Sequence, residues 1–231
     1  MYLTRAYLDP TSRQVRADLR SPEGLHKTVM RAFAQHTGPL LRAAEAVLHR
    51  LDHDSGDRLV LLVQSRSRPM VQGWPAGYAL DARHDPDLVS LNVGENPVTR
   101  DVRAERAAIQ AGQRFVFRLR ANTTRKIHTK TGPDGIARHG RRVPLRGDEE
   151  RLRWLTRHAE AAGFSVNPDQ LRITEVAAAT GRGGKTVTLA GATFEGMLLV
   201  TDAERFRAAL ECGIGPAKAY GFGLLSIAAA Q

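Results

Sequence analysis

The chain contains a single cysteine, Cys212, and no apolar run that approaches the roughly 20 residues needed to cross a bilayer. One cysteine cannot form a disulfide within the chain, and without a cysteine pair the sequence cannot build a zinc finger or ribbon. These absences argue against a disulfide-stapled secreted scaffold and against a membrane protein. We therefore expect a soluble protein of the reducing cytoplasm.

Acidic residues are too few to balance the basic ones. The sequence has 24 Asp and Glu against 34 Lys and Arg, which leaves a formal net charge of +10 at pH 7. Because unpaired charges are costly to bury, the excess has to lie on the surface. Such a surface favours a polyanionic partner, RNA or DNA, with salt-dependent affinity. An Arg-rich composition can also reflect the base composition of a genome, so charge alone leaves both readings open.

The length of 231 residues exceeds the usual single domain of roughly 100 to 150 residues. Residues 67–111 are rich in proline and glycine and then strongly charged, as is typical of a domain boundary. We expect an N-terminal domain at 1–92, a linker at 93–112 and a C-terminal domain at 113–231.

Hydrophobic periodicity predicts the elements of both halves. The first half shows strands at 2–8, 47–52 and 59–65, an Arg-rich loop after the first strand, and a helix at 22–35 that begins with Ser21 as cap and Pro22. The second half shows a strand at 113–120, a basic loop at 121–142, and a helix at 148–162 closed by Gly163. Strand-like segments at 171–178, 185–190 and 193–200 follow, then a helix at 202–211 with Thr201 and Glu204 as capping box, and a strand at 222–228.

This order of strands and helices predicts an α+β fold of two tandem ferredoxin-like domains, each an RRM-like βαββαβ unit. The second helix of the first domain is not evident in the sequence.

His26 is the first candidate for chemistry. On a helix over 22–35, Leu25, Val29 and Phe33 form the buried stripe, whereas His26, Lys27 and Arg31 fall outside it. An imidazole titrates near neutral pH and can move a proton, and adjacent cations can hold a phosphate. Glu23 precedes His26 by three residues and can orient it or act only as a helix-start carboxylate. An ordinary surface histidine remains the alternative.

A glycine-rich segment near the end of the chain is the second candidate. Gly213, Gly215, Gly221 and Gly223 lie between a helix and the last strand. Such a loop permits close backbone approach to a phosphate, with Lys218 adding charge and Tyr220 a face for stacking. A helix cap followed by tight turns is the alternative.

The segment Ala179-Thr-Gly-Arg-Gly-Gly-Lys-Thr186 approximates a nucleotide phosphate loop. That loop has to open a helix, but the residues after it have the pattern of a strand, so we expect a hairpin tip that presents Arg182 and Lys185 to nucleic acid. Solvated turn charges are the alternative. His49 and His53 are four residues apart on an extended segment without a third ligand, and we expect them to be surface histidines rather than metal ligands.

Several of these features together resemble one family, the CasE endoribonucleases of type I-E CRISPR systems. They are the opening Tyr2-Leu-Thr-Arg5 strand, Ser21-Pro22 leading to His26, the strand end Arg118-Leu-Arg-Ala-Asn122 and the glycine-rich terminus. The resemblance runs across nearly the whole chain and is strongest in 1–35, 113–164 and 194–227. It implies two ferredoxin-like domains, recognition of a CRISPR repeat stem-loop RNA, cleavage at the base of that stem, and association with the subunits of the Cascade complex.

The resemblance also implies roles for particular residues. His26 matches the catalytic histidine of the family, Lys27 and Arg31 match neighbouring basic positions, and the loop from Gly213 to Gly223 matches the glycine-rich loop. Some members have a tyrosine where this chain has Glu23, so no tyrosine role carries over. The implied reaction needs no metal and no cofactor: the ribose 2′-hydroxyl attacks the adjacent phosphate, and His26 acts as general base or acid. We expect Arg120, Arg125, Lys126, Arg182 and Lys185 to contact the stem. A non-catalytic RNA-binding subunit on the same scaffold is the rival interpretation.

Overall fold

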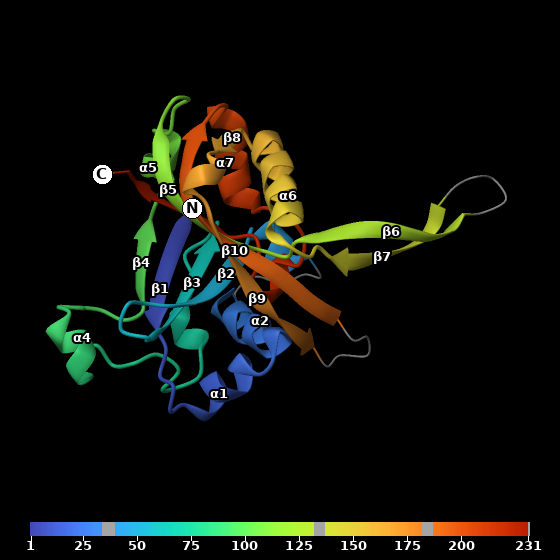
Figure 1. The fold of residues 1–231 in the computed structure, drawn as a ribbon. Helices are drawn as coiled ribbons and strands as arrows, with labels where there is room; N and C mark the ends of the chain where they lie inside the picture. Colours follow the sequence, from blue (N-terminus) through green and yellow to red (C-terminus); the bar gives the residue numbers. More distant parts are fainter. Residues whose placement is uncertain (34–39, 132–136, 182–186, 231) are drawn as a thin grey trace.

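The computed structural model describes residues 1–33, 40–131, 137–181 and 187–230 (Figure 1). Its first half is built on a four-stranded sheet with the strand order β2-β3-β1-β4. The strands are β1 (Tyr2–Tyr7), β2 (Leu48–His53), β3 (Leu59–Ser65) and β4 (Val98–Asp101). All neighbours in this sheet are antiparallel. This is the strand order of a ferredoxin-like βαββαβ unit, as predicted.

The fourth strand lies within the stretch predicted as a linker. β4 pairs with β1, with Tyr2 opposite Asp101. The first sheet therefore extends to Asp101, whereas the predicted first domain ended at residue 92. The strand was missed because β4 is short, has two charged residues among its four, and shows no apolar alternation.

Two helices pack against the first sheet. α2 (Pro22–Met30) begins at Ser21, whose side chain accepts a hydrogen bond from the Gly24 N–H at 3.0 Å. It ends at Met30 in a 3₁₀ turn, η1 (Arg31–Phe33), and the remaining residues of the predicted helix, 34 and 35, lie outside the described ranges. The core between α2 and the sheet contains Leu25, Val29 and Phe33, the stripe that the sequence predicted.

The Arg-rich segment expected to be a loop is in fact helical. α1 (Arg13–Leu19) buries Val15 and Asp18. The Asp18 carboxylate accepts hydrogen bonds at 2.8 Å from the Tyr78 hydroxyl and from Gln14 Nε2. These tertiary contacts stabilise a seven-residue helix that would be marginal by itself.

The second helix of the first domain is replaced by an irregular excursion. Residues 66–97, all of which the structure describes, hold only the 3₁₀ turn η2 (Val71–Gly73) and the short helix α4 (Pro86–Ser90). A further short helix, α3 (Leu41–Ala44), leads into β2.

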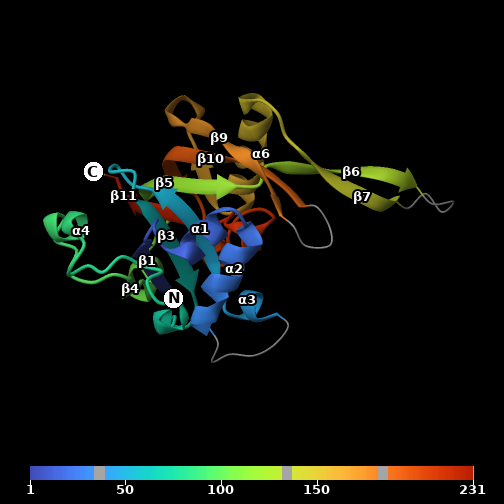
Figure 2. The ribbon, with the colours of Figure 1, turned by 90° about the horizontal axis from the view of Figure 1, so that it is seen from below.

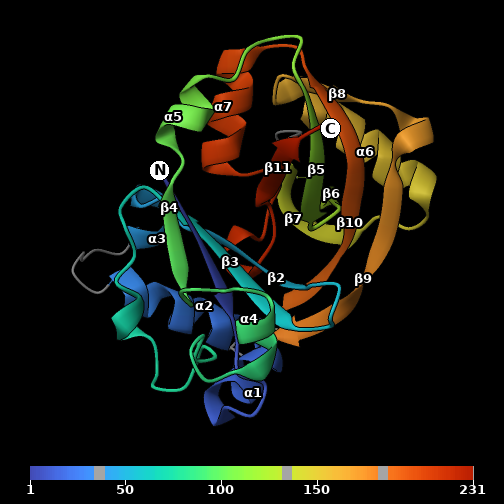
Figure 3. The ribbon, with the colours of Figure 1, turned by 90° about the vertical axis from the view of Figure 1, so that its left-hand side faces the viewer.

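The second half is built on a five-stranded sheet with the order β11-β5-β10-β8, and β9 also pairs with β10. Its strands are β5 (Arg114–Ala121), β8 (Phe164–Val166), β9 (Arg172–Gly181), β10 (Val187–Val200) and β11 (Leu225–Ala229). Its other elements are α5 (Arg103–Ala107), α6 (Asp148–Ala161), α7 (Ala203–Cys212), η3 (Pro168–Gln170) and η4 (Lys218–Tyr220). Figure 3 shows α6 and α7 with this sheet, which completes the second ferredoxin-like domain.

Two details of this domain differ from the prediction. The predicted segments 185–190 and 193–200 are not separate strands: residues 187–200 form the single strand β10, whose register shifts between Leu189 and Gly191, and residues 185 and 186 lie outside the described ranges. Glycine at 191 accommodates the carbonyl of Ala121 on β5, where a Cβ would clash. The cap of α7 is Asp202, which accepts hydrogen bonds from the N–H groups of Glu204 and Arg205 at 3.0 Å, so the expected capping role of Thr201 is wrong.

The basic loop expected at 121–142 is a two-stranded hairpin instead. β6 (Thr124–Thr131) and β7 (Ala137–Pro144) pair with each other only and project from one side of the body, as Figures 1 and 2 show. The many charges leave no apolar face that would have predicted strands.

The two domains are joined by buried polar contacts. Arg50 on β2 donates through Nη1 to the carbonyl oxygens of Arg118 and Leu224, both at 3.1 Å. Gln64 on β3 donates to the Leu210 carbonyl at 2.8 Å and accepts from Arg106 at 2.6 Å. These contacts set the first domain against β5, α7 and the segment before β11. Across the described residues no helix is both long and apolar enough to cross a membrane.

Candidate active site

His26 lies on α2 at the surface of the first domain. Its imidazole is half-buried, and Nδ1 is enclosed without a hydrogen-bond partner among the described residues. Burial lowers the pKa of His26 below its ordinary value, the nearby Arg42 lowers it further, and Glu23 partly offsets both. The lowered pKa favours the neutral ring at physiological pH.

His49 is the neighbour of His26, and the expectation that it lies at the surface is wrong. It comes from β2, is 1% exposed, and stacks against His26 with ring centroids 6.1 Å apart and ring planes inclined by 21°. Burial, followed by the positive charges around it, lowers the pKa of His49 to about 3. The site thus holds two adjacent imidazoles, one of them enclosed and neutral at physiological pH.

The glycine-rich loop of the second domain lies against this pair. Its turn η4 contacts both α2 and β2. Gly221 has a φ of +81°, and a Cβ built there would lie 3.7 Å from His49 Nε2. A side chain at 221 would therefore be strained by its backbone conformation, and its Cβ would lie in van der Waals contact with the imidazole. The predicted loop and the predicted histidine, 195 residues apart along the chain, thus belong to one site.

The backbone of the loop is partly engaged within the protein. The Gly213 N–H donates to the Ala209 carbonyl at 2.8 Å, and the Gly223 N–H donates to the Arg120 carbonyl at 2.8 Å. These two N–H groups shape the loop and are not free for a phosphate. Gly215 packs near Trp154, where a Cβ would lie 2.9 Å from the indole ring. Lys218 and Tyr220 are half-buried at the turn, and burial lowers the pKa of Lys218.

The two cations predicted beside His26, Lys27 and Arg31, have different surroundings. The exposed Lys27 pairs with Glu23, Nζ to Oε1 at 3.0 Å. Arg31 is exposed at the start of η1, and its carbonyl lies where a Cβ at Gly73 would clash. Neither has a described contact with the imidazole of His26. Arg42, which the sequence did not single out, is the cation that acts on both histidines.

Arg120 lies between the domains rather than on an open surface. Its guanidinium stacks on the Phe222 ring, 5.2 Å from the centroid, and Nη1 donates to the Leu51 carbonyl at 3.4 Å. Burial lowers the pKa of Arg120. These contacts place its guanidinium at the junction between β2 and the segment that contains Phe222.

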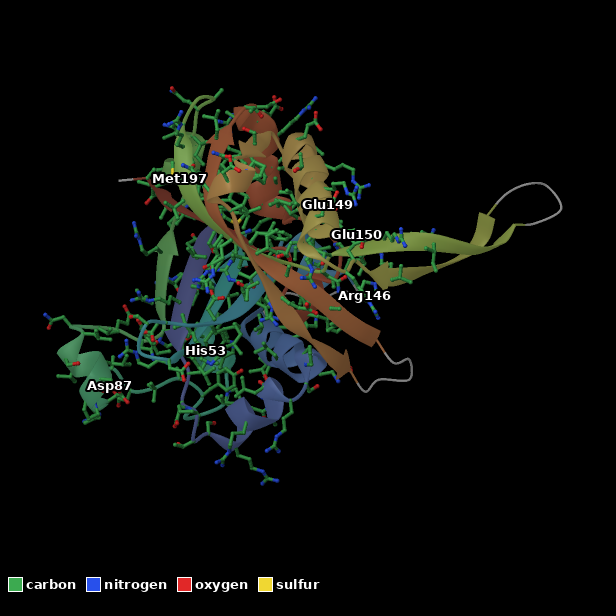
Figure 4. All side chains as sticks on the ribbon, in the orientation of Figure 1. His53, Asp87, Arg146, Glu149, Glu150 and Met197 are labelled. Atoms are coloured by element: carbon green, nitrogen blue, oxygen red, sulfur yellow. The ribbon has the colours of Figure 1, made fainter. Side chains whose placement is uncertain are left out.

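A second basic region lies at the base of the β6–β7 hairpin. Arg125 and Lys126 are exposed there, as predicted from the charge pattern. Arg125 borders a hollow of about 280 Å³ whose other lining residues are Leu145, Glu150, Arg153, Trp154 and Arg157. Figure 4 shows Arg146, Glu149 and Glu150 at the start of α6, beside this hairpin. Arg153 and Arg157 were missed, although their spacing of four residues places them on one face of a helix.

Arg182 and Lys185 lie outside the described residues. The strands around them form a hairpin, with Gly181 opposite Val187, and no helix follows. The segment therefore lacks the helix that a nucleotide phosphate loop requires.

Among the described residues, no group of three or more His, Cys, Asp or Glu side chains is placed to hold a metal ion.

The chain thus combines two ferredoxin-like domains with His26 on α2 and a glycine-rich loop beside it. Residues 1–229 match the family described as CRISPR associated protein, and the chain belongs to that family. A particular relative is the CRISPR-associated endoribonuclease Cse3 of Thermus thermophilus, which is 32% identical over 240 aligned positions, covering 99% of this chain and 100% of the relative.

Solved structures agree with this assignment. Cse3 bound to a 19-nucleotide RNA has a TM-score of 0.73 and 31% identity and covers 98% of both chains. Thermus thermophilus Cse3 bound to an RNA that represents a pre-cleavage complex gives the same TM-score at 30% identity, again over 98% of both chains. Cas6e of Escherichia coli K-12, with a TM-score of 0.67 and 23% identity over the full length of both, shows the same fold.

Proposed function

We propose that this protein is an endoribonuclease that cleaves CRISPR precursor RNA at the base of the repeat stem-loop. The observation that carries the proposal is the half-buried His26, whose pKa is lowered and whose helix α2 lies against the glycine-rich loop. The named activity of the Cse3 relative and its pre-cleavage RNA complex support it. We place the reaction in the cytoplasm, where the single cysteine stays reduced.

The chemistry we propose is an internal transesterification. The 2′-hydroxyl of the ribose attacks the adjacent phosphorus, the bond to the 5′ oxygen breaks, and a 5′-hydroxyl leaves with a 2′,3′-cyclic phosphate behind it. Water can then hydrolyse the cyclic phosphate to a 3′-phosphate. The neutral His26 takes the 2′-hydroxyl proton in one form of this scheme and, once protonated, returns a proton to the leaving oxygen. A lowered pKa suits the base role, because most of the imidazole is unprotonated at neutral pH.

Cations next to the reacting phosphate would stabilise its developing negative charge. Lys27 and Arg31 are our candidates from the sequence. Arg42 and Lys218 are added by the structure, because Arg42 acts on the pKa of His26, of His49 and of Lys218. Tyr220 offers a ring for stacking on an unpaired base.

For the stem, we propose recognition by shape and backbone charge. The β6–β7 hairpin and the β9–β10 hairpin extend from the same side of the body in Figures 1 and 2. Arg125 and Lys126 at the base of the first, with Arg153 and Arg157 on α6, would contact phosphates of an A-form duplex. Arg182 and Lys185 remain candidates on the second.

We propose in addition that the protein joins a Cascade assembly after cleavage. The Cascade subunit CasE of Escherichia coli K-12 is 36% identical over 125 residues, 52% of this chain and 60% of that protein. A non-catalytic RNA-binding subunit is the second candidate, and Glu23 favours it, because some relatives have a tyrosine at that position.

One experiment distinguishes the endoribonuclease from the non-catalytic RNA-binding subunit. Purified protein is incubated with hairpin repeat RNA in excess EDTA, beside the same RNA with a 2′-deoxy substitution at the scissile nucleotide. Cutting at a single site in the all-ribose RNA, abolished by the substitution, supports transesterification. Tight binding without cutting of any cognate hairpin overturns the enzyme and favours the binding subunit.

A further inference from the structure

Gln64 on β3 is fully buried, although glutamine side chains are mostly exposed in proteins. Both polar atoms of its amide are used. Nε2 donates hydrogen bonds to the carbonyl oxygens of Leu210 at 2.8 Å and Glu211 at 3.2 Å, and Oε1 accepts one from Arg106 Nη2 at 2.6 Å. Because a guanidinium only donates and a carbonyl oxygen only accepts, these partners allow one orientation of the amide.

The two carbonyls belong to the last turn of α7, the helix that leads into the glycine-rich loop. The last carbonyls of a helix have no partner within the helix and need donors from elsewhere. Here the donors are Gln64 of the first domain and Arg106 of α5, whose Nη1 also donates to the Leu210 carbonyl at 3.4 Å. Gln64 therefore fixes the end of α7 relative to β3.

The neighbour of Gln64 on β2 contacts the start of the loop itself. Leu48 pairs opposite Gln64, and a Cβ built at Gly213 would lie 2.8 Å from Leu48 Cδ1. With a φ of +75° as well, position 213 requires glycine for this close approach. The next residue of β2 is the buried His49. The start of the loop is thus set by the same two strands that carry the enclosed imidazole.

The end of the loop is fixed to its start and to the first domain. The Ile214 N–H donates to the Gly223 carbonyl at 2.9 Å, and Arg50 Nη1 donates to the Leu224 carbonyl at 3.1 Å. The first domain therefore contacts the chain on both sides of the loop, through Gln64 before it and Arg50 after it. The turn η4 between these contacts lies against α2 and β2.

We propose that Gln64 is a positioning residue for the cleavage reaction: its hydrogen bonds to the end of α7 set the position of the glycine-rich loop against His26 and His49. The proposal rests on the proposed function. Gln64 is enclosed between the domains and acts through the loop rather than on the RNA. A displacement of about 1 Å at a reacting centre can slow a reaction by about 100-fold, even when its cause lies far from the chemistry.

Stabilisation of α7 alone is the alternative role of Gln64, and Arg207 allows the two roles to be separated. Arg207 makes a contact of the same kind from the same helix, because its Nη1 donates to the Ile109 carbonyl at 2.7 Å. That contact joins α7 to the segment before β5 and not to the first sheet. Arg207→Met is therefore the matched control for Gln64→Met, since each change replaces a hydrogen-bonding side chain by an unbranched apolar one.

The test compares both variants with the parent as full-length proteins. Single-turnover cleavage of hairpin repeat RNA gives the rate, and fluorescence anisotropy gives the affinity. NMR signals of the Gly221 amide and the His49 ring, recorded without RNA, report the position of the loop. Urea denaturation gives the stability.

Gln64→Met should slow cleavage about 10- to 100-fold with unchanged RNA affinity, and should shift both NMR signals. Arg207→Met should lower the urea midpoint but leave the rate, the affinity and both signals as in the parent. A parent-like rate and parent-like signals in Gln64→Met, or an equal slowing in Arg207→Met, would overturn the proposal.

Arg106→Met provides a second test where Gln64→Met does not fold. It removes the donor that orients the Gln64 amide, so it should shift the same two signals, and unmoved signals there would overturn the proposal. Shifted signals in a protein whose parent cuts no RNA would leave the positioning of the loop standing and overturn the proposed function.

Discussion

Arg50 of the first domain donates a hydrogen bond from Nη1 to the carbonyl oxygen of Leu224, 174 positions later in the chain, at 3.1 Å. The same guanidinium donates to the Arg118 carbonyl at 3.1 Å and to the Asp52 carboxylate at 2.8 Å. Only 2% of Arg50 is exposed. One side chain thus links β2, β5 and the segment that follows the glycine-rich loop.

We expect Arg50→Ala to lower the free energy of unfolding by about 3 to 5 kcal/mol, because it leaves Asp52 and two carbonyls near the junction without their donor. Urea denaturation measures the change. Arg100→Ala is the matched control: Arg100 pairs with Glu105 at 3.3 Å on the surface, and its removal should cost about 0.5 kcal/mol or less. Equal effects of both substitutions would contradict a junction held by Arg50.

His26→Ala should slow single-turnover cleavage by at least about 100-fold while the protein still binds the hairpin, because the change removes the proposed proton-transfer group but little of the basic surface. Gel separation of cleaved RNA and a filter-binding assay measure the two quantities. His84→Ala, which removes an 81% exposed imidazole paired with Asp81, is the control and should leave both unchanged. Undiminished cleavage by His26→Ala would remove His26 from the mechanism.

Glu23→Gln should move the acid limb of the pH–rate profile to lower pH. The Glu23 carboxylate raises the pKa of His26, so its neutralisation lowers that pKa further and keeps the imidazole unprotonated in more acidic buffer. Cleavage rates between about pH 4.5 and 8, at one fixed ionic strength so that screening stays constant, provide the measurement. Glu105→Gln neutralises a distant surface carboxylate as the control. A shift of the limb to higher pH would contradict the sign.

The double substitution Arg125→Ala and Lys126→Ala should weaken hairpin binding and reduce the slope of log affinity against log salt by about one for each phosphate that is no longer neutralised. Fluorescence anisotropy at several salt concentrations measures both. Arg83→Ala with Arg100→Ala removes two exposed cations of the first domain; Figure 4 shows nearby Asp87 on the side opposite the β6–β7 hairpin. An equal reduction of the slope in the control would mean that binding follows total charge rather than this hairpin.

His49→Phe should make the protein less sensitive to acid. The pKa of His49 is about 3 in the folded protein and 6.5 in an ordinary environment, so between these values the unfolded chain binds a proton that the folded one does not. The parent therefore loses up to about 1.4 kcal/mol per pH unit from this group as the pH falls below 6.5. Urea midpoints from about pH 7 to 4 measure the slope. His53→Phe, on the exposed end of β2, is the control, and a parallel decline in all three proteins would contradict the expectation.

The elements with clear periodicity were predictable from the sequence. β3 occupies the predicted residues 59–65, and α2 starts at its predicted cap because Ser21 and Pro22 act locally. α1 and the β6–β7 hairpin were missed for the same reason: their stability comes from tertiary contacts or from strand pairing, and their charged residues show no apolar period.

The site was predictable in its parts but not in its arrangement. His26 and the glycine-rich loop were identified separately, whereas their contact depends on how the two domains dock. His49 did carry a signal, since it alternates with Val47 and Leu51 on one face of β2, and that face is buried. Arg42 carried none, because its position follows from the short helix α3 that leads into β2.

Because Gly221 lies beside His49, the site is complete only after the chain has been synthesised past the glycine-rich loop. A polypeptide released before residue 213 carries both imidazoles but neither the loop against them nor the final strand beside β5. During synthesis the half with the two imidazoles emerges first, and the half with the glycine-rich loop emerges last. An unfinished copy therefore lacks the completed site, so the reactivity proposed for this site arises only after the second domain is in place.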